Sequence, residues 1–205
     1  MLVVNTAADS YDLTVLSTVK AELSIEGGAS DAQLTEQIHQ ASDICATYCS
    51  RVFADETVTE TLRNVRRTVI GLQRGPATTI TSVTEDGTAL LATEYEAETD
   101  DKGLSYLYRL SDDDRVDWDA AKLVIVYTGG YALLDGLPRT IERACIDLVK
   151  LLYFSASRDP VLRSVDVPGV MSKTYWVGAT SDGALPPHIE ANLAPFRRVD
   201  GFSDD

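Results

Sequence analysis

The densest group of side chains that could do chemistry is a cluster of five aspartates. Its members are Asp112, Asp113, Asp114, Asp117 and Asp119. Carboxylate oxygens are the ligands that Ca²⁺ and Mg²⁺ prefer, so a small metal-dependent enzyme is one function that the cluster could support. The calcium-binding EF-hand pattern fails here, because Asp117 stands where that loop needs glycine and Leu123 where it needs glutamate. We therefore favour a solvated turn between strands and predict no bound metal or cofactor.

The thiols and imidazoles do not form a catalytic or zinc-binding set either. Cys45 and Cys49 lie four residues apart, but no second pair of Cys or His follows at the spacing of a zinc finger. These two cysteines and Cys145 are predicted to be buried in helix packing, and their odd number argues against a disulfide framework. His39 and His188 are the only histidines, and no Gly-x-Ser-x-Gly motif is present. The sequence therefore predicts a protein that is not an enzyme.

Phosphate binding is not indicated by a glycine-rich loop, although a basic patch is present. Gly129-Gly130 is not followed by Gly-Lys-Ser/Thr, so a bend after a strand is the better interpretation. Arg63, Arg66, Arg67 and Arg74 form the basic patch. Its candidate partners are DNA phosphates or an acidic patch on another subunit. Opposite patches on one molecule suit head-to-tail contacts within a ring.

Composition indicates a folded protein with a local excess of acid. The chain has 205 residues, of which 44% are hydrophobic and 24% are charged, as in ordinary folded domains. Its formal net charge is −14, which is opposite to that of a typical free-standing nucleic-acid-binding protein. Residues 85–119 alone contain twelve acidic and three basic side chains. The remainder of the chain is nearly balanced.

Targeting signals are not apparent. The apolar stretch Met1-Leu2-Val3-Val4 is too short for a signal peptide, and no basic segment precedes it. The sequence also contains no run of about 18 apolar residues, the length that would cross a bilayer. We therefore expect folding in a reducing cytoplasm and no interaction with a membrane.

Helical periodicity occurs near both ends of the chain. A short helix is predicted within residues 12–23, and a longer one from Ser30 to Phe53. Apolar residues recur along the longer helix at steps of four and three and form one stripe: Leu34, Ile38, Ala41, Cys45, Tyr48 and Val52. Pro138 suits the first turn of a third helix that ends near Phe154. A short helix is predicted at Ile189–Leu193, and residues 1–11 are expected to form a loose arm.

Between the helices, short β-like segments predict a small antiparallel sheet or barrel. The candidate strands are Thr57–Leu62, Thr68–Leu72, Thr79–Val83, Glu94–Glu98, Leu104–Leu110 and Lys122–Tyr127. Asp86-Gly87 predicts a tight hairpin turn, because both residue types tolerate a positive φ. The apolar run Leu123–Val126 predicts a central strand.

Residues 156–187 are apolar but show no helical period. They either pack on their own domain or lie across another molecule, and we favour the second interpretation. The predicted fold is α+β in a single domain, with a helical core of about four helices, an inserted small antiparallel β-subdomain and an extended C-terminal arm. The expected parts are residues 12–56 for the first helices, 57–128 for the β insertion, 129–155 for the core helix and 156–205 for the extension with its short helix.

In this order, the segments resemble the head–tail connector (adaptor, or head-completion) proteins of tailed bacteriophages. The matching segments are Asp12–Leu23, Ser30–Leu34 with Ile38, Ala41-Ser42 and Tyr48-Cys49, Arg74-Gly75-Pro76 with Ile80–Val83, Tyr127–Tyr131 with Leu137-Pro138 and Ile141–Leu152, and Leu193–Arg198. The resemblance implies a structural protein of the virion, located at the head–tail junction and made in the cytoplasm of the host bacterium. It implies a ring, commonly a dodecamer, that docks beneath the portal protein and extends the DNA channel. Its implied partners are the portal, neighbouring copies, a downstream stopper or tail protein, and genomic DNA that passes without sequence-specific binding.

Two sets of residues are assigned to these contacts. The expected portal or subunit contacts are Trp176, Phe196, Arg197 and Arg198, because interface hot spots favour aromatic side chains and arginine. The acidic loop, comprising Asp112, Asp113, Asp114 and Asp117, is expected to face the channel and to repel DNA phosphates. Two alternatives stay open, namely the metal-dependent enzyme and a tail-terminator-type ring protein of the same virion.

Overall fold

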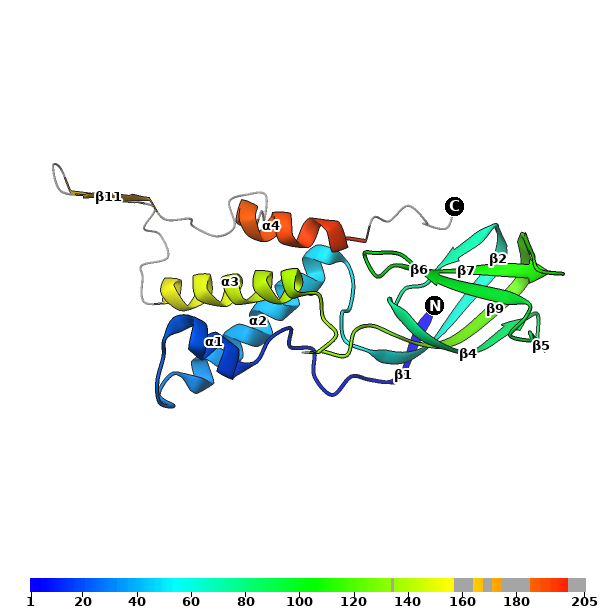
Figure 1. Cartoon of the computed structure of the whole chain (residues 1–205), viewed down its shortest axis with the longest axis horizontal. Coiled ribbons are helices and arrows are strands. Elements are labelled where there is room, and N and C mark those ends of the chain that lie inside the picture. Colours follow the sequence, from blue (N-terminus) through cyan, green and yellow to red (C-terminus); the bar gives the residue numbers. More distant parts are fainter. Residues whose placement is uncertain (134, 157–163, 168–170, 175–184, 199–205) are drawn as a thin grey trace. The chain divides into compact units, whose positions relative to one another are not determined.

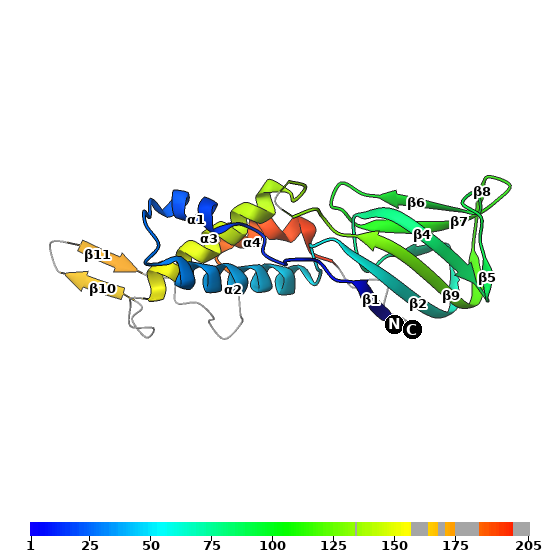
Figure 2. The same cartoon turned by 90° about the horizontal axis from the view of Figure 1, so that it is seen from below.

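The computed structural model describes residues 1–133, 135–156, 164–167, 171–174 and 185–198 of the chain. These residues form helices and antiparallel sheets, so the predicted α+β class is confirmed (Figures 1 and 2). The chain divides into two compact units. The β unit comprises Met1–Tyr11, Cys49–Leu137 and Phe196–Asp205, and the helical unit comprises Asp12–Tyr48 and Pro138–Pro195.

The β unit contains two antiparallel sheets. The larger sheet has the strand order β1-β2-β9-β4-β5, and the smaller has the order β3-β7-β6 with β8 also paired to β7. The strands are β1 (Leu2–Thr6), β2 (Glu56–Arg67), β3 (Val69–Gly71), β4 (Ala77–Glu85), β5 (Thr88–Ala89), β6 (Tyr95–Thr99), β7 (Ser105–Ser111), β8 (Asp114–Val116) and β9 (Trp118–Gly129). The long strands β2 and β9 pair from Glu56 opposite Gly129 to Arg67 opposite Trp118. The predicted central strand is confirmed, since β9 lies between β2 and β4.

Side chains from both sheets build the core of the β unit. Its buried residues are Val58, Val65, Ile70, Leu72, Val83, Leu107, Trp118, Ala120, Leu123, Ile125 and Tyr127. Trp118 is fully buried and donates its indole N–H to the carbonyl of Leu107 at 3.2 Å. The indole thereby links β9 of one sheet to β7 of the other. Burial of these apolar side chains supplies the main driving force for the packing of the two sheets.

The predicted Asp86-Gly87 hairpin turn is confirmed between β4 and β5. Both residues have a positive φ, of 49° and 88°, and Glu85 pairs with Thr88 across the two-residue loop. The carboxylate of Asp86 has a second task. It accepts hydrogen bonds from the backbone N–H groups of Ala121 at 3.2 Å and Lys122 at 2.7 Å. The turn therefore anchors the middle of β9.

At the level of Ala121 and Lys122 of β9, both β2 and β9 change the face that they bury. On β2 the fully buried positions step from Glu60 to Val65, and on β9 they step from Ala120 to Leu123. A regular strand buries every second residue, so each strand contains one extra residue here. Asn64, which lies at this level of β2, has a φ of +51°.

The expectation of a loose N-terminal arm was wrong for Leu2–Thr6. This segment is the edge strand β1, which pairs antiparallel with β2 from Leu2 opposite Glu60 to Thr6 opposite Thr57. Its residues are mostly exposed. The strand conformation of this segment depends on hydrogen bonds to β2 and not on burial of one face. Its sequence therefore needs no alternation of apolar and polar residues, and no such pattern is present.

The helical unit contains α1 (Leu16–Leu23), α2 (Asp31–Cys49), α3 (Arg139–Ala156) and α4 (Pro187–Leu193), with the short η1 (Ala194–Phe196) after α4. The predicted stripe of α2 is buried at Leu34, Ile38, Ala41 and Cys45. The α3 helix contributes Ile141, Ala144, Cys145, Leu148 and Val149 to the buried set, and α4 contributes Ile189 and Leu193. No described helix is both long enough and apolar enough to cross a membrane.

Several element boundaries differ from the predictions. The α2 helix ends at Cys49 and not at Phe53, because Ser50 adopts a left-handed φ of +51° that terminates a helix. Most of the predicted C-terminal arm lies outside the described residues. Within it, the backbones of β10 (Ser164–Val167) and β11 (Met171–Thr174) form a two-stranded antiparallel pair.

One buried cation fastens the loops at one end of the β unit. The guanidinium of Arg51 donates to the carbonyls of Gly75 at 2.7 Å, Gly103 at 2.9 Å and Lys102 at 2.9 Å. It also donates to the carbonyl of Phe196 at 3.4 Å. Burial lowers the pKa of the Arg51 guanidinium. The backbone carbonyls take the place of the water that this cation would otherwise bind.

Two glycines and two aromatic rings surround the Arg51 guanidinium, and the glycines let the loop backbones come close to it. A Cβ on Gly75 would collide with the carbonyl oxygen of Gly103, and a Cβ on Gly103 would collide with the Tyr131 hydroxyl. The guanidinium carbon lies 5.4 Å from the ring centre of Phe53 and 6.0 Å from that of Tyr131. Both distances are within the range of cation–π attraction.

We expect Arg51→Met to destabilise the protein by about 3 kcal/mol, because several buried carbonyls lose their donor together. Arg51→Lys should recover only part of that loss, since one ammonium cannot reach the same set of carbonyls. Urea unfolding gives the free energies. Arg66→Met is the matched control, because the Arg66 side chain is 85% exposed, and it should change the free energy by less than about 0.5 kcal/mol. An unchanged free energy for Arg51→Met would contradict this assignment.

Candidate docking surfaces of the β unit

The acidic loop is an exposed turn between two strands, as its composition predicted. Asp112 and Asp113 form the two-residue loop that joins β7 to β8, and Ser111 pairs with Asp114 across it. Their φ angles are 51° and 68°, which aspartate tolerates better than most residues. The side chains of all three aspartates are exposed. The loop therefore presents a concentrated negative charge on a short hairpin.

The remaining members of the aspartate cluster have local structural partners. Asp117 accepts a hydrogen bond from the hydroxyl of Thr68 at 2.8 Å, and Asp119 pairs with Arg66 at 3.3 Å. Among the residues that the structure describes, no three His, Cys, Asp or Glu side chains are grouped closely enough to hold a metal ion. The alternative of a metal-dependent enzyme therefore has no ligand set in this part of the chain.

The predicted portal or subunit contacts are only partly described. Trp176 lies outside the described residues. Phe196 is half-buried and Arg197 is exposed. Arg198 donates its backbone N–H to the carbonyl of Cys49 at 2.9 Å, and its half-buried side chain lies beside β2. The structure thus brings Arg198 together with the early part of the β unit.

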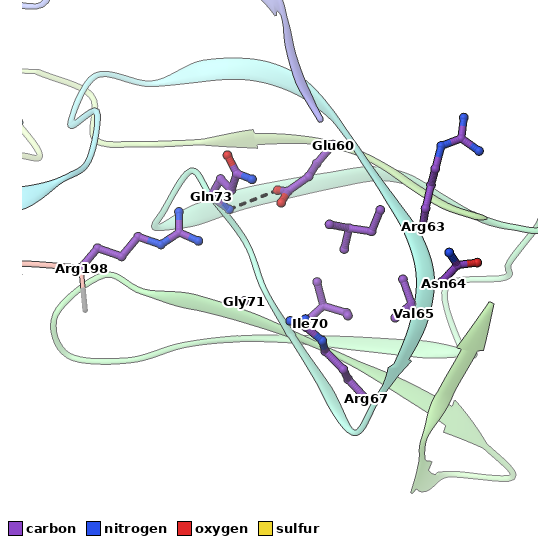
Figure 3. Close-up of a pocket in the computed structure, with 10 residues that line it drawn as sticks. Glu60, Arg63, Asn64, Val65, Arg67, Ile70, Gly71, Gln73 and Arg198 are labelled. Atoms are coloured by element: carbon purple, nitrogen blue, oxygen red, sulfur yellow. Dashed lines mark hydrogen bonds between the residues drawn. The ribbon is translucent and has the colours of Figure 1, made fainter. Parts of the chain in front are cut away.

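A pocket lies where Arg198 meets β2, and we name it the basic slot. Its lining residues are Glu60, Leu62, Arg63, Asn64, Val65, Arg67, Ile70, Gly71, Gln73 and Arg198. Figure 3 shows the slot between β2 and the segment of β3, which converge near Arg67. Arg198 points toward Gln73 at one end of the slot, whereas Arg63 points outward from its rim (Figure 3). The slot therefore combines an apolar middle with cationic edges.

A buried carboxyl group closes one end of the basic slot. Glu60 is only 1% exposed, and its Oε2 accepts hydrogen bonds from the Tyr127 hydroxyl at 2.9 Å and the Gln73 backbone N–H at 3.1 Å. Burial raises the pKa of Glu60, and the two hydrogen bonds oppose the rise. Burial also raises the pKa of the Tyr127 hydroxyl. The carboxyl group is therefore held in a site that favours its protonated form more than water does.

Two cations lie directly opposite each other at the rim. Arg63 of β2 pairs in register with Lys122 of β9, and both residues are exposed. Neither side chain has a hydrogen-bond or ion-pair acceptor among the described residues. Like charges at opposed positions of an antiparallel pair destabilise a sheet. This arrangement would be relieved by an anionic group above it.

Two arginines of the predicted basic patch form ion pairs within the chain. Arg66 pairs with Asp119, and Arg74 donates to Glu56 at 2.7 Å in a largely buried ion pair. Arg63 and Arg67 both line the slot, where Arg198 joins them from a distant part of the sequence.

The cysteines and histidines do not form a reactive site. Cys45, Cys49 and Cys145 are buried free thiols, as predicted, and burial raises the pKa of Cys49 to about 11. His39 shares a hydrogen bond of 2.6 Å with Asp12, which raises the pKa of the imidazole. His188 is exposed on α4.

Comparison with known proteins agrees with this architecture. A family model described as "Head completion protein" matches residues 12–199. The chain belongs to the head completion protein family. Its role is structural, in the head–tail assembly of a phage-type virion, as the sequence resemblance predicted. No curated protein matches the sequence.

Solved structures of gene transfer agent (GTA) particles share the fold of this head completion protein. A chain in the neck of an empty GTA particle computed with C6 symmetry has a TM-score of 0.62 at 19% identity. A chain in the virion of a native GTA particle has 0.61 at 18% identity, and one in the neck of a native particle computed with C12 symmetry has 0.59 at 18% identity. Each comparison covers 98% of both chains.

Sequence reasoning found the arginines of this head completion protein but missed the basic slot. Arg63 and Arg67 were recognised as part of a basic run, and Arg198 was assigned separately to an interface. Their proximity depends on the way the chain returns to Cys49, which no local pattern in the sequence encodes. Glu60 was also missed, although a single glutamate at a core-facing position of a predicted strand was a usable signal.

We expect Glu60→Gln to change how the stability of the protein depends on pH. A carboxyl whose pKa is raised in the folded state stabilises fully below its ordinary value of 4.5, and that contribution is lost as pH rises through the folded pKa. Because glutamine cannot ionise, the free energy of unfolding of the variant minus that of the wild type should increase as pH rises above 4.5. Thermal melts between about pH 4 and pH 8 measure this difference. Tyr127→Phe is the control, because it retains the carboxyl group and should retain the loss; a difference that falls with pH would refute the assignment.

Proposed function

We propose that this head completion protein forms a ring beneath the portal protein and extends the channel through which the genome passes. Its other face docks the next head-completion or tail protein. Neighbouring copies, the portal and a downstream stopper or tail protein are its partners, and DNA passes without sequence-specific binding. The protein is made in the host bacterial cytoplasm and acts in the virion at the head–tail junction.

The observation that carries this proposal is the extent of the family match, which runs from residue 12 to residue 199. It includes both units of the chain, so it does not rest on one shared module. The similar folds in the necks of GTA particles support the same location, because those chains are part of a particle neck.

We assign the contact with the portal or with a neighbouring subunit to Trp176, Phe196, Arg197 and Arg198. Aromatic side chains and arginine dominate the energetics of most protein interfaces. Within this set, the exposed Arg197 and the half-buried Phe196 and Arg198 follow α4 directly. Phe154, which is 59% exposed near the end of α3, offers a further apolar contact.

The acidic hairpin suits the lining of a DNA channel. Asp112, Asp113 and Asp114 are exposed at the tip of a rigid two-residue turn. Repeated around a ring, such tips would create a negative zone that repels the DNA phosphates, so that the duplex slides and does not adhere. Asp117 lies at the base of this hairpin, after β8.

The portal contact can be tested by co-purification with the portal protein. The best variant replaces residues 157–184 with a Gly/Ser linker and retains α4, because Ile189 and Leu193 are buried in the helical unit. We expect the wild type to co-purify and the linker variant to lose the portal. Trp176→Ala should weaken binding about tenfold, as expected for an aromatic hot spot.

Leu91→Ala is the matched control for this experiment, because Leu91 is 69% exposed in the β unit and outside the assigned contact. It should bind the portal as the wild type does. Failure of the wild type to bind any portal would refute the proposed function. Full binding by the linker variant would refute only the assignment of the contact.

The channel assignment predicts an effect on DNA movement and none on assembly. The triple variant Asp112→Asn, Asp113→Asn, Asp114→Asn keeps the turn, because asparagine also tolerates a positive φ. We expect particles with this variant to assemble normally and to release their genome severalfold more slowly in an ejection assay. Labelling of these positions from outside an assembled neck would place the hairpin on the outer rim and reject the assignment.

A further inference from the structure

The basic slot contains a strand edge whose pairing stops half-way. The β1 strand covers β2 from Thr57 to Glu60, and Thr61 donates its N–H to the carbonyl of Met1. Beyond Thr61, the same edge of β2 has no strand partner among the described residues, and β3 pairs there with β7 alone. Unpaired strand edges of this kind accept an added strand through backbone hydrogen bonds.

The positive charges around this edge of β2 favour the binding of an anionic ligand. Arg63 and Lys122 face each other without an acceptor in the part of the chain that is described, and Arg67 and Arg198 line the slot beside them. The cost of keeping like charges opposed is removed when carboxylates or phosphates pair with them.

The apolar floor of the slot favours a ligand with carboxylates over one with phosphates. Leu62, Val65 and Ile70 line its middle, and Leu62 is only half-buried. A phosphodiester backbone would gain nothing from covering an apolar side chain, whereas an extended peptide places alternate side chains on both kinds of surface. The combination therefore favours an acidic strand of a protein over DNA.

The same unit carries a strand with the complementary properties. The β6 strand lies at the other edge of the smaller sheet and pairs with β7 alone among the described strands. Residues 96–99 are exposed, and Glu96 and Glu98 alternate with Ala97 and Thr99. Both glutamates share a single cation, Arg115, so their combined charge is only partly neutralised.

We propose that β6 of one copy docks in the basic slot of the next copy, with its glutamates on the cationic rim and its small residues over Leu62, Val65 and Ile70. The contact joins two different patches of identical chains, so it is head-to-tail and can close into a ring. This inference rests on the proposed ring and names the surfaces that form it.

The first test reverses the charges on each side of the contact. The slot variant is Arg63→Glu with Arg198→Glu, and the β6 variant is Glu98→Lys, which leaves the ion pair of Glu96 with Arg115 in place. Thermal melts check that the slot variant folds: a glutamate at position 63 gains Lys122 as a partner, whereas Arg198→Glu removes the attraction between Arg198 and Glu60. Each variant alone should reduce the number of copies on the portal about tenfold or more, and an equimolar mixture should restore it, because alternating copies regain opposite charges.

Arg66→Glu is the matched control, because Arg66 is on the same strand but does not line the slot. It should assemble as the wild type does. Normal assembly of the folded slot variant would overturn the proposal. Normal assembly combined with poor DNA retention would also overturn it, in favour of phosphate binding by the slot.

The second test uses a cross-link that only head-to-tail packing can extend. In the double variant Arg63→Cys, Glu98→Cys, mild oxidation should produce a ladder of covalent multimers, whereas each single variant should give no species beyond a dimer. The three native cysteines are buried and should stay silent. Absence of a ladder on the portal overturns the proposal while the ring beneath the portal survives. If the wild type does not bind the portal, the proposed function fails separately. In that case the cross-link is tested in concentrated free protein, where a missing ladder overturns the proposed contact between β6 and the basic slot.

Discussion

The β unit depends on the buried guanidinium of Arg51, which holds loops together rather than strands. Arg51 holds the carbonyls of Gly75, Lys102 and Gly103, which lie on two loops far apart in the sequence, and it also reaches Phe196. These four hydrogen bonds all end on backbone carbonyls, and the charge of Asp100 and the side chain of Tyr131 add to the stabilisation of the cation. A buried cation without such partners would be strongly destabilising, and this makes the arrangement specific. The loops can close around Arg51 only because two glycines leave room for their backbones.

Much of the acidic excess of residues 85–119 serves the fold and not a ligand. Arg109 donates to Glu85 at 3.1 Å and lies 3.5 Å from Glu94. Arg115 lies over the ring of Tyr108 and bridges two glutamates of β6. Asp86 holds two backbone N–H groups of β9. Among the described residues, three exposed aspartates of this segment gather at the β7–β8 turn, so the composition overstated the acidic surface and the structure localises it.

The elements predicted correctly are those whose signals are local. The Asp86-Gly87 turn follows from the φ preferences of two adjacent residues, and the buried face of α2 follows from spacing along one helix. Strand β1 and the basic slot could not be predicted in this way. Val3 and Val4 become a strand because β2 offers them hydrogen bonds, and Arg198 reaches β2 because its backbone binds Cys49. Contacts between distant segments leave no periodicity in either segment.

The slot lies at the level where β2 and β9 both change the face that they bury. If β2 continued to bury every second residue after Glu60 and Leu62, Asn64 and Arg66 would face the core and Val65 would face solvent. The left-handed Asn64 reverses this order, so that Val65 returns to the core while Arg66 stays outside. Asp86 fixes the same level of β9 by binding Ala121 and Lys122. The irregularity therefore keeps the core apolar, while the register of β2 and β9 continues unchanged through this level and sets Arg63 opposite Lys122 at the rim of an unfinished strand edge.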